Sequence, residues 1–286
     1  MKTAMRQELS SPQNPLLRAL RRALREGEPG EDGAFGVEGP HLVEEALRSP
    51  VEVTALVAAR SAEARLAEFE ASANGRLRSY LVPDRVFQSL AQTETPQGIA
   101  ALVRLPERQL EECLVKPKAL VAVLVGLQDP GNLGTILRSL EAFGGAACLL
   151  TENTVSPFNP KAARASAGSL FRVPVFRRLK LEEILKLCQR NGLRTVALAP
   201  HLGATGGGRI TKRQAGRSGA GRELSQVDLR SAVALFIGQE GSGLPAEVLK
   251  QVDTVAEIPL AAPVESLNAA MAATLALYEA ARQRRG

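Results

Sequence analysis

Three short segments of the chain place glycines beside polar side chains, a combination that suits ligand binding. The first reads LQDPGNLGTILRS (residues 127–139), the second LFIGQEGSGL (235–244) and the third IPLAAPVESLN (258–268). Glycines let a ligand approach the main chain, and the polar groups beside them can orient a reacting group or stabilise developing charge. The second segment lacks both the GxGxxG spacing of a dinucleotide site and the lysine of a P-loop, so neither of those sites is expected.

The polar residues of the segments have simpler structural interpretations as well. Asn132 could cap the helix that begins near it, and Arg138, six residues on, could form an ion pair at the surface. Ser266 could cap the last helix, with Asn268 as a capping partner. Residue type and spacing leave both the structural and the functional interpretation open.

The elements around these segments predict an open parallel sheet with helices on both faces. The run ALVAVLVGL, which begins at Ala119, is apolar throughout, as expected of a strand buried on both faces. Strands and helices alternate after it, and ligands bind such sheets beyond the carboxyl ends of the strands, where the three segments lie. Further strands are predicted at 147–150, 195–199, 232–237 and 254–258, and helices at 133–143, 160–165, 181–191, 245–251 and 267–282.

A smaller α/β unit is predicted ahead of this sheet. The stretch LLRALRRALR (16–25) has its leucines on one helical face and its arginines elsewhere, which suits either a solvated surface helix or a phosphate-contacting face. The predicted domains are 1–105, a linker 106–118, and 119–286. In the first domain, strands are predicted at 35–37, 51–57, 79–82 and 99–103, and helices at 41–47, 62–69 and 84–90.

Composition restricts the partners. The 286 residues carry a formal net charge of +6, which weakly favours an anionic partner such as nucleic acid. Aromatic residues make up only 3%, without any Trp, so a base-stacking platform is not expected. The glycine- and arginine-rich stretch 203–222 predicts a flexible loop whose basic residues could also touch RNA.

Metal and membrane sites are not expected. The three cysteines are far apart and follow no ligand spacing, and Cys148 lies in an apolar run typical of a buried free thiol. His41 and His201 have no clustered partners, so no metal site is predicted. The N-terminus has no signal-peptide pattern and no apolar run reaches transmembrane length, so we expect a soluble cytoplasmic protein.

Together, the three segments resemble the signature motifs of SpoU/TrmH-type RNA 2′-O-ribose methyltransferases, which belong to the SPOUT class. The matching patterns are N-L-G-x-x-x-R-S, then F-I-G-x-E-G-x-G-L, then IPLAAPVESLN, in this order and on these strand ends. Residues 159–175 resemble the family's segment between the first two motifs, so the resemblance covers 119–286. Residues 10–47 more weakly resemble the RNA-substrate-binding domain that precedes such catalytic domains, which is α/β and similar to a small ribosomal protein.

The resemblance implies a deep trefoil knot in the second domain, a homodimer packed through the knot region, and S-adenosylmethionine as methyl donor to RNA, with ribosomal RNA the first expectation. Roles in catalysis or in positioning fall on Arg138, Asn132, Glu240, Ser266 and Asn268, and cofactor contacts fall on Gly238, Ile258, Leu267, Leu260 and Gly243. The family's third motif usually has Met and Gly where this chain has Leu260 and Ala262, which changes side-chain volume and backbone freedom in that loop.

The chemistry of the motif residues agrees with ribose methylation. A 2′-hydroxyl must lose its proton as it attacks, whereas an arginine keeps its own, so Arg138 is expected to stabilise the developing alkoxide and to grip a neighbouring phosphate. Three alternatives differ in substrate or activity: a transfer RNA 2′-O-methyltransferase, a base methyltransferase of the knotted class, and an RNA-binding protein without catalysis. The full set of motif residues argues against the base methyltransferase, and the presence of Arg138 argues against the loss of catalysis.

Overall fold

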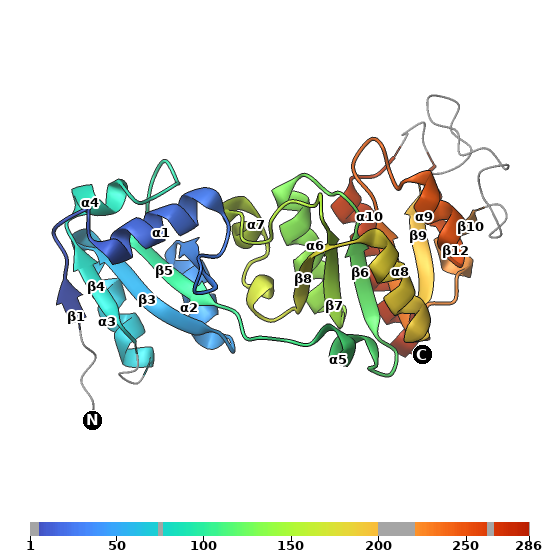
Figure 1. The fold of residues 1–286 in the computed structure, drawn as a ribbon, viewed down its shortest axis with the longest axis horizontal. Helices are drawn as coiled ribbons and strands as arrows, with labels where there is room; N and C mark the ends of the chain where they lie inside the picture. The colour runs from blue at the N-terminus through green and yellow to red at the C-terminus, as the bar shows by residue number, and fades with distance from the viewer. Residues whose placement is uncertain (1–5, 74–76, 200–220, 262–265, 286) are drawn as a thin grey trace. The chain divides into compact units, whose positions relative to one another are not determined.

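The computed structural model describes residues 6–73, 77–199, 221–261 and 266–285. Its contacts divide the chain into two units (Figure 1). One comprises Met1–Glu107 and Ser156–Arg172, and the other comprises Arg108–Val155 and Val173–Gly286. The loop expected at 203–222 lies outside the described residues except for its last two, and Ala262 lies outside them as well.

A mixed sheet forms the centre of the first unit, in the order β1-β4-β3-β5-β2. Strands β1, β4 and β3 run parallel, and β5 is antiparallel to both β3 and β2. Its strands are β1 (Arg6–Glu8), β2 (Ala34–Glu38), β3 (Glu52–Ala59), β4 (Ser79–Val82) and β5 (Ile99–Arg104). Its helices are α1 (Pro15–Glu26), α2 (Pro40–Arg48), α3 (Glu63–Ser72), α4 (Asp84–Gln88) and α7 (Pro160–Ala165), with short 3₁₀ turns η1 (Arg60–Ala62) and η2 (Ser169–Phe171).

Helix α1 confirms the amphipathic helix predicted from LLRALRRALR. Asn14 caps it through a bond from the Leu16 N–H (2.9 Å), and Gly27, in the left-handed conformation with φ 62°, ends it. Leu17, Leu20 and Leu24 are buried in one cluster with residues of β3, β5 and α4. The arginines of α1 are therefore left on its outer side, as the periodicity requires.

Residues 156–172 pack with the first unit, although the predicted boundary at 119 places them in the second domain. The Phe158 and Phe171 rings lie 4.5 Å and 6.4 Å from the ring of Phe35. Arg172 donates to the Glu45 carboxylate (2.8 Å). A segment far along the chain thus completes the apolar core beside β2, a long-range contact that periodicity does not reveal.

A seven-stranded sheet forms the centre of the second unit, in the order β10-β12-β9-β11-β6-β7-β8, and every pairing among its described strands is parallel. The parallel sheet is therefore confirmed, and its predicted strands begin and end within a few residues of the observed ones. Its strands are β6 (Leu120–Leu124), β7 (Ala147–Thr151), β8 (Val175–Leu179), β9 (Arg194–Ala199), β10 (Arg222–Glu223), β11 (Val233–Ile237) and β12 (Thr254–Glu257). Strands β1, β8 and β10 were not expected, because none of them is a continuous apolar run.

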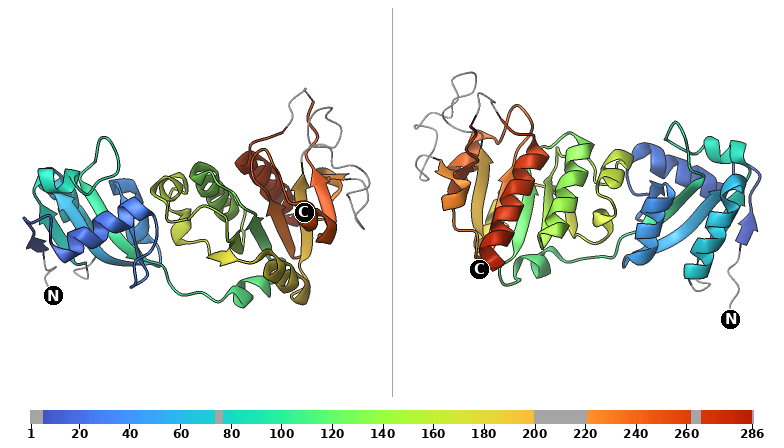
Figure 2. Two further views of the ribbon diagram at one scale, coloured as in Figure 1. Left: turned by 45° about the horizontal axis from the view of Figure 1, so that its top comes forward. Right: turned by 180° about the vertical axis from the view of Figure 1, so that it is seen from behind.

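Helices cover both faces of this sheet. On one face, α5, α8 and α9 share a core cluster with Val121 and Val123 of β6 (Figure 1). On the other face, α6 and α10 lie side by side, as the right-hand view of Figure 2 shows. The helices are α5 (Leu110–Leu114), α6 (Pro130–Ala142), α8 (Leu181–Arg190), α9 (Ala246–Gln251) and α10 (Ala269–Arg285), with a 3₁₀ turn η3 (Leu224–Gln226).

The cysteines are free and buried, which confirms the interpretation of Cys148. Burial raises the pKa of the Cys188 thiol to about 12. No described helix combines the length and the apolar character that crossing a bilayer requires. Among the described residues, no three His, Cys, Asp or Glu side chains gather as a metal site would need.

Candidate functional site

The three glycine-containing segments open at one edge of the second sheet. Strands β6, β11 and β12 are parallel, so their carboxyl ends face the same edge. The three segments leave the sheet at this edge. They begin at Leu127, at Leu235 within β11, and at Ile258. The structure therefore confirms the predicted placement at strand ends, which is the usual ligand-binding edge of such sheets.

Asn132 does not cap helix α6. Asp129 does so, because its Oδ1 accepts the Asn132 main-chain N–H at 2.8 Å. The Asn132 side chain is half-buried and has no hydrogen-bond partner among the described residues. Its amide is therefore available to a ligand at a helix N-terminus, where main-chain N–H groups favour negative charge.

Arg138 lies on the same helix and is exposed, without an ion-pair partner in the described part of the chain. The surface ion pair considered for it is thus not formed. Its neighbour Ser139 points inward and shares a 2.7 Å hydrogen bond with Thr274 of α10. The guanidinium is consequently free to meet an anion, while the residue beside it holds the helix in place.

Helices α6 and α10 run parallel, with their N-termini at the same end. Ser139 meets Thr274, and one turn later Phe143 contacts Tyr278 with ring centroids 5.8 Å apart. The constant offset of 135 residues shows that the helices share one direction. The first turn of α6, with Asn132, and the residues just before α10 therefore lie towards the same edge of the sheet.

Asn268 caps α10. Its Oδ1 accepts main-chain N–H groups from Ala270 (2.9 Å) and Met271 (3.3 Å). Asn268 therefore has a structural role at the start of α10, but it is the cap itself, whereas Ser266 was expected to be the cap. Ser266 is exposed and has no hydrogen-bond partner among the residues that the structure describes. Its hydroxyl can reach a ligand at this end of α10.

The segment after β11 is a tight turn that requires glycine. Gln239 and Gly243 bond to each other through both main-chain groups, at 3.2 Å and 3.0 Å. A Cβ on Gly238 would lie only 2.3 Å from the Gly243 carbonyl carbon and oxygen, so no larger residue fits there. Glu240 lies at the exposed tip of the turn, with no partner in the described chain. The turn thus presents main chain and one carboxylate at the sheet edge.

Two threonines join the ends of β6 and β7. The Gly126 N–H donates to Thr151 Oγ1 (2.9 Å), and Thr154 Oγ1 donates to the Leu124 carbonyl (3.0 Å). Gly126 itself has φ 68°, and a Cβ there would lie 2.6 Å from the Gln239 amide nitrogen. These contacts hold the start of the first motif against the turn after β11.

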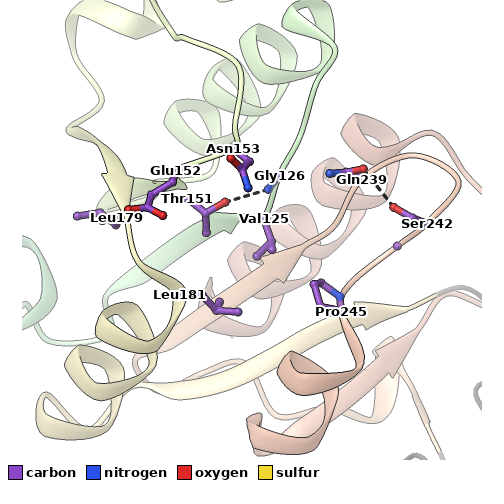
Figure 3. A pocket seen from close by; sticks show the side chains of 11 residues that line it. Val125, Gly126, Thr151, Glu152, Asn153, Leu179, Leu181, Gln239, Ser242 and Pro245 are labelled. Carbon is purple, nitrogen blue, oxygen red and sulfur yellow. Dashed lines mark hydrogen bonds between the residues drawn. The ribbon is translucent and has the colours of Figure 1, made fainter.

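A pocket of about 330 Å³ lies at this edge. Residues that follow β6, β7, β8 and β11 line it, among them Gly126, Glu152, Leu181, Gln239 and Gly243 (Figure 3). Of the residues expected to bind the cofactor, only Gly243 is part of this lining, and none of the five expected catalytic or positioning residues is.

Sequence reasoning did not single out Glu152, Asn153 or Gln239, which line the pocket. Glu152 and Asn153 directly follow β7, so the strand-end rule that selected the three glycine-containing segments could also have selected them. Glu152 and Asn153 were missed because no glycines lie beside them in the sequence.

Comparison with known proteins identifies the family to which the chain is similar. Residues 119–278 match the model of the SpoU rRNA Methylase family, and residues 14–101 match the MRM3-like substrate binding domain. The chain is 30% identical over 272 residues to the 23S rRNA (guanosine(2553)-2′-O)-methyltransferase RlmP of Bacillus subtilis (strain 168), covering 95% of this chain and 98% of that protein.

Solved structures agree over nearly the whole chain. An AdoMet-bound rRNA methyltransferase from Sinorhizobium meliloti superposes with a TM-score of 0.79 at 26% identity, covering 97% of this chain and 98% of that one. An RNA 2′-O ribose methyltransferase superposes with a TM-score of 0.73 at 32% identity, covering 98% of this chain and 100% of that one.

Proposed function

Since the chain belongs to the SpoU rRNA Methylase family, we propose that it methylates the 2′-hydroxyl of one ribose in 23S ribosomal RNA. It is an S-adenosylmethionine-dependent RNA 2′-O-ribose methyltransferase. The observation that supports the proposed site is that its polar side chains are available to bind a ligand. Asn132, Arg138 and Glu240 follow adjacent parallel strands at one sheet edge, and none of their side chains has a partner among the described residues.

The residues assigned to the cofactor fit it chemically. Ile258, Leu260 and Leu267 are half-buried aliphatic side chains that can enclose an adenosine. In the turn after β11, the main chain at Gly238 lies against the main chain at Gly243. Without side chains in the way, a ligand can form hydrogen bonds directly with these main-chain groups. S-adenosylmethionine supplies a methyl group activated by its positively charged sulfur.

The protein's own groups prepare the nucleophile. The Arg138 guanidinium binds the phosphate beside the target ribose through two parallel N–H donors. From that position its charge stabilises the 2′-alkoxide that develops as the hydroxyl loses its proton, and a phosphate oxygen accepts that proton. Four further residues orient the ribose, the cofactor or Arg138 for reaction. They are Asn132, Glu240, Ser266 and Asn268.

Replacing Arg138 tests this function. We expect Arg138→Ala to lower methyl transfer to RNA by roughly 100-fold or more, the usual loss for a group that stabilises charge in the transition state. S-adenosylmethionine binding should change little, because Arg138 is assigned to the RNA. Arg190→Ala is a matched control, since Arg190 is also exposed and lacks a partner in the described chain. Equal turnover of the two variants would remove Arg138 from the mechanism.

The first unit is proposed to bind RNA. Residues 14–101 match a substrate-binding domain, and α1 displays Arg18 and Arg25, both exposed and without a partner in the part of the chain described. Such residues can meet phosphates. Because ribosomal RNA is the substrate, we place the protein in the cytoplasm.

The knot and the homodimer are proposed from the family resemblance. The strand order β12-β9-β11 supports the knot, because β12 follows β11 in the chain and yet lies beyond β9. Met271, Leu275 and Tyr278 support the dimer. They recur at helical spacing along α10 and are 60%, 43% and 51% exposed. An apolar stripe of this kind usually marks an interface.

A further inference from the structure

The pocket after β6, β7, β8 and β11 lies in a different part of the sheet edge from three of the five proposed cofactor residues. Ile258, Leu260 and Leu267 follow β12, which β9 separates from β11. The pocket extends the other way from β11, over β6, β7 and β8. The turn at 238–244 stands between the two regions and contributes Gly243 to the pocket. The pocket is therefore a second compartment of the same edge.

The lining of the pocket selects a neutral, partly apolar ligand. Val125, Leu181 and Pro245 supply apolar surface, and Figure 3 shows Glu152 and Asn153 on one side and Gln239 on the other. Among the described residues, the lining contains no lysine or arginine. A phosphate or carboxylate would therefore meet the Glu152 charge without a cation to offset it, which disfavours an anionic ligand.

The polar groups of the lining have unused bonding capacity. The Glu152 side chain has no hydrogen-bond or ion-pair partner among the described residues. The Gln239 Oε1 accepts from Ser242 Oγ (3.2 Å), and the Gln239 amide nitrogen donates to no described group. The pocket thus offers one carboxylate as an acceptor and, across from it, an amide donor.

The Glu152 carboxylate matches the Watson–Crick edge of guanine. Guanine presents two neighbouring N–H donors, at N1 and N2, beside the O6 acceptor, and a carboxylate can accept both donors at once. Adenine and cytosine each present one amino donor beside a ring-nitrogen acceptor, and uracil presents one N–H between two carbonyl acceptors, so a second carboxylate oxygen would meet an acceptor in each case. Apolar side chains can hold the faces of the base, as they do where a nucleotide is turned out of its stack.

We propose that this pocket binds the guanine base of the nucleotide whose ribose is methylated, an assignment that rests on the proposed function. Gly126 lines the pocket and immediately precedes the segment that carries Asn132 and Arg138. Gln239 lines it and immediately precedes Glu240. A base held in the pocket lies beside the strand ends from which both motif segments leave the sheet. The volume of about 330 Å³ is at the small end of ligand sites, which suits a single base.

Substitution of Glu152 combined with a change in the base tests the assignment. Unmodified 23S ribosomal RNA made in vitro is methylated with labelled S-adenosylmethionine, and the methylated nucleotide is mapped. We expect a guanosine, and roughly a 10-fold or greater loss of kcat/KM for RNA in Glu152→Gln, since a charged hydrogen-bond acceptor is lost. Glu247→Gln is the matched control, because Glu247 is exposed on α9, outside the pocket.

Inosine at the mapped nucleotide isolates the contact, because inosine lacks only the N2 amine of guanosine. The wild type should lose activity on the inosine-containing RNA, whereas Glu152→Gln should discriminate much less between the two RNAs. Binding of S-adenosylhomocysteine should be the same in all variants.

The possible outcomes separate the two proposals. Failure of the wild type to methylate any RNA would refute the proposed function itself. Methylation of another nucleotide, or equal behaviour of Glu152→Gln and Glu247→Gln, would overturn the pocket assignment and leave the function intact. Weaker S-adenosylhomocysteine binding by Glu152→Gln would assign the pocket to the cofactor and overturn the proposal in that way.

Discussion

Asn268 is expected to have two roles that substitution can separate. As the cap of α10 it accepts two main-chain N–H groups, at 2.9 Å and 3.3 Å. Removing such a cap costs about 1 kcal/mol, within a range of about 0.5–2 kcal/mol. We therefore expect Asn268→Ala to lower the melting temperature by about 2–4 °C, the shift typical of that loss in a domain of this size.

Asn268→Asp changes only the second role. The aspartate oxygen can accept the same two N–H groups, and a negative charge at a helix N-terminus adds about 0.3–1 kcal/mol of stability. The side-chain NH₂ donor, however, is lost. If that donor positions the ribose or the cofactor, Asn268→Asp should melt at or above the wild-type temperature and yet methylate RNA more slowly.

Calorimetric melting and labelled methyl transfer, measured on the same preparations, distinguish the roles. Full activity of Asn268→Asp would show that Asn268 is a cap and nothing more. An unchanged melting temperature for Asn268→Ala would contradict the capping geometry itself. A loss of activity that followed stability in both variants would refute a direct role for the amide.

Three further outcomes follow from other contacts. Gly238→Ala should greatly weaken S-adenosylmethionine binding by calorimetry, because its Cβ would lie 2.3 Å from the Gly243 main chain. Gly192→Ala strains the backbone at φ 67° but its Cβ meets nothing within 4 Å, so this variant, away from the site, should bind normally. Arg284→Met should lower the free energy of unfolding by about 1–3 kcal/mol in urea, since the partly buried guanidinium donates to the carbonyls of Lys118, Leu229 and Ser231. A midpoint equal to that of wild type would contradict this role. Leu275→Glu should shift the protein from dimer to monomer in analytical ultracentrifugation, and an unchanged mass would remove α10 from the proposed interface.

Local patterns were sufficient for most of the fold because they report burial directly. The apolar run after Lys118 became β6, and the leucine spacing of residues 16–25 became α1. Strand β8 was missed because Arg177 and Arg178 interrupt its apolar character, and Arg178 has φ 58°, where the ladder shifts register. An edge strand needs apolar contact on fewer sides, so its sequence carries a weaker signal.

The capping assignments show where local reasoning ends. Asn132 and Ser266 both have side chains common at helix starts, yet Asp129 and Asn268 are the caps. A cap is decided by which residue has the backbone angles that aim its oxygen at free N–H groups, and the path of the preceding loop sets those angles. Among the described residues, the Asn132 and Ser266 side chains have no partners.

The parallel sheet, the three motif segments and the family could all be predicted from local sequence, because strand burial and motif spacing are properties of neighbouring residues. Tertiary structure alone decided that residues 156–172 join the first unit and that Glu152 lies opposite Gln239 across a pocket. These contacts join residues that are far apart along the chain. Glu152 and Gln239 follow different strands, and only the order β11-β6-β7 brings those strand ends together.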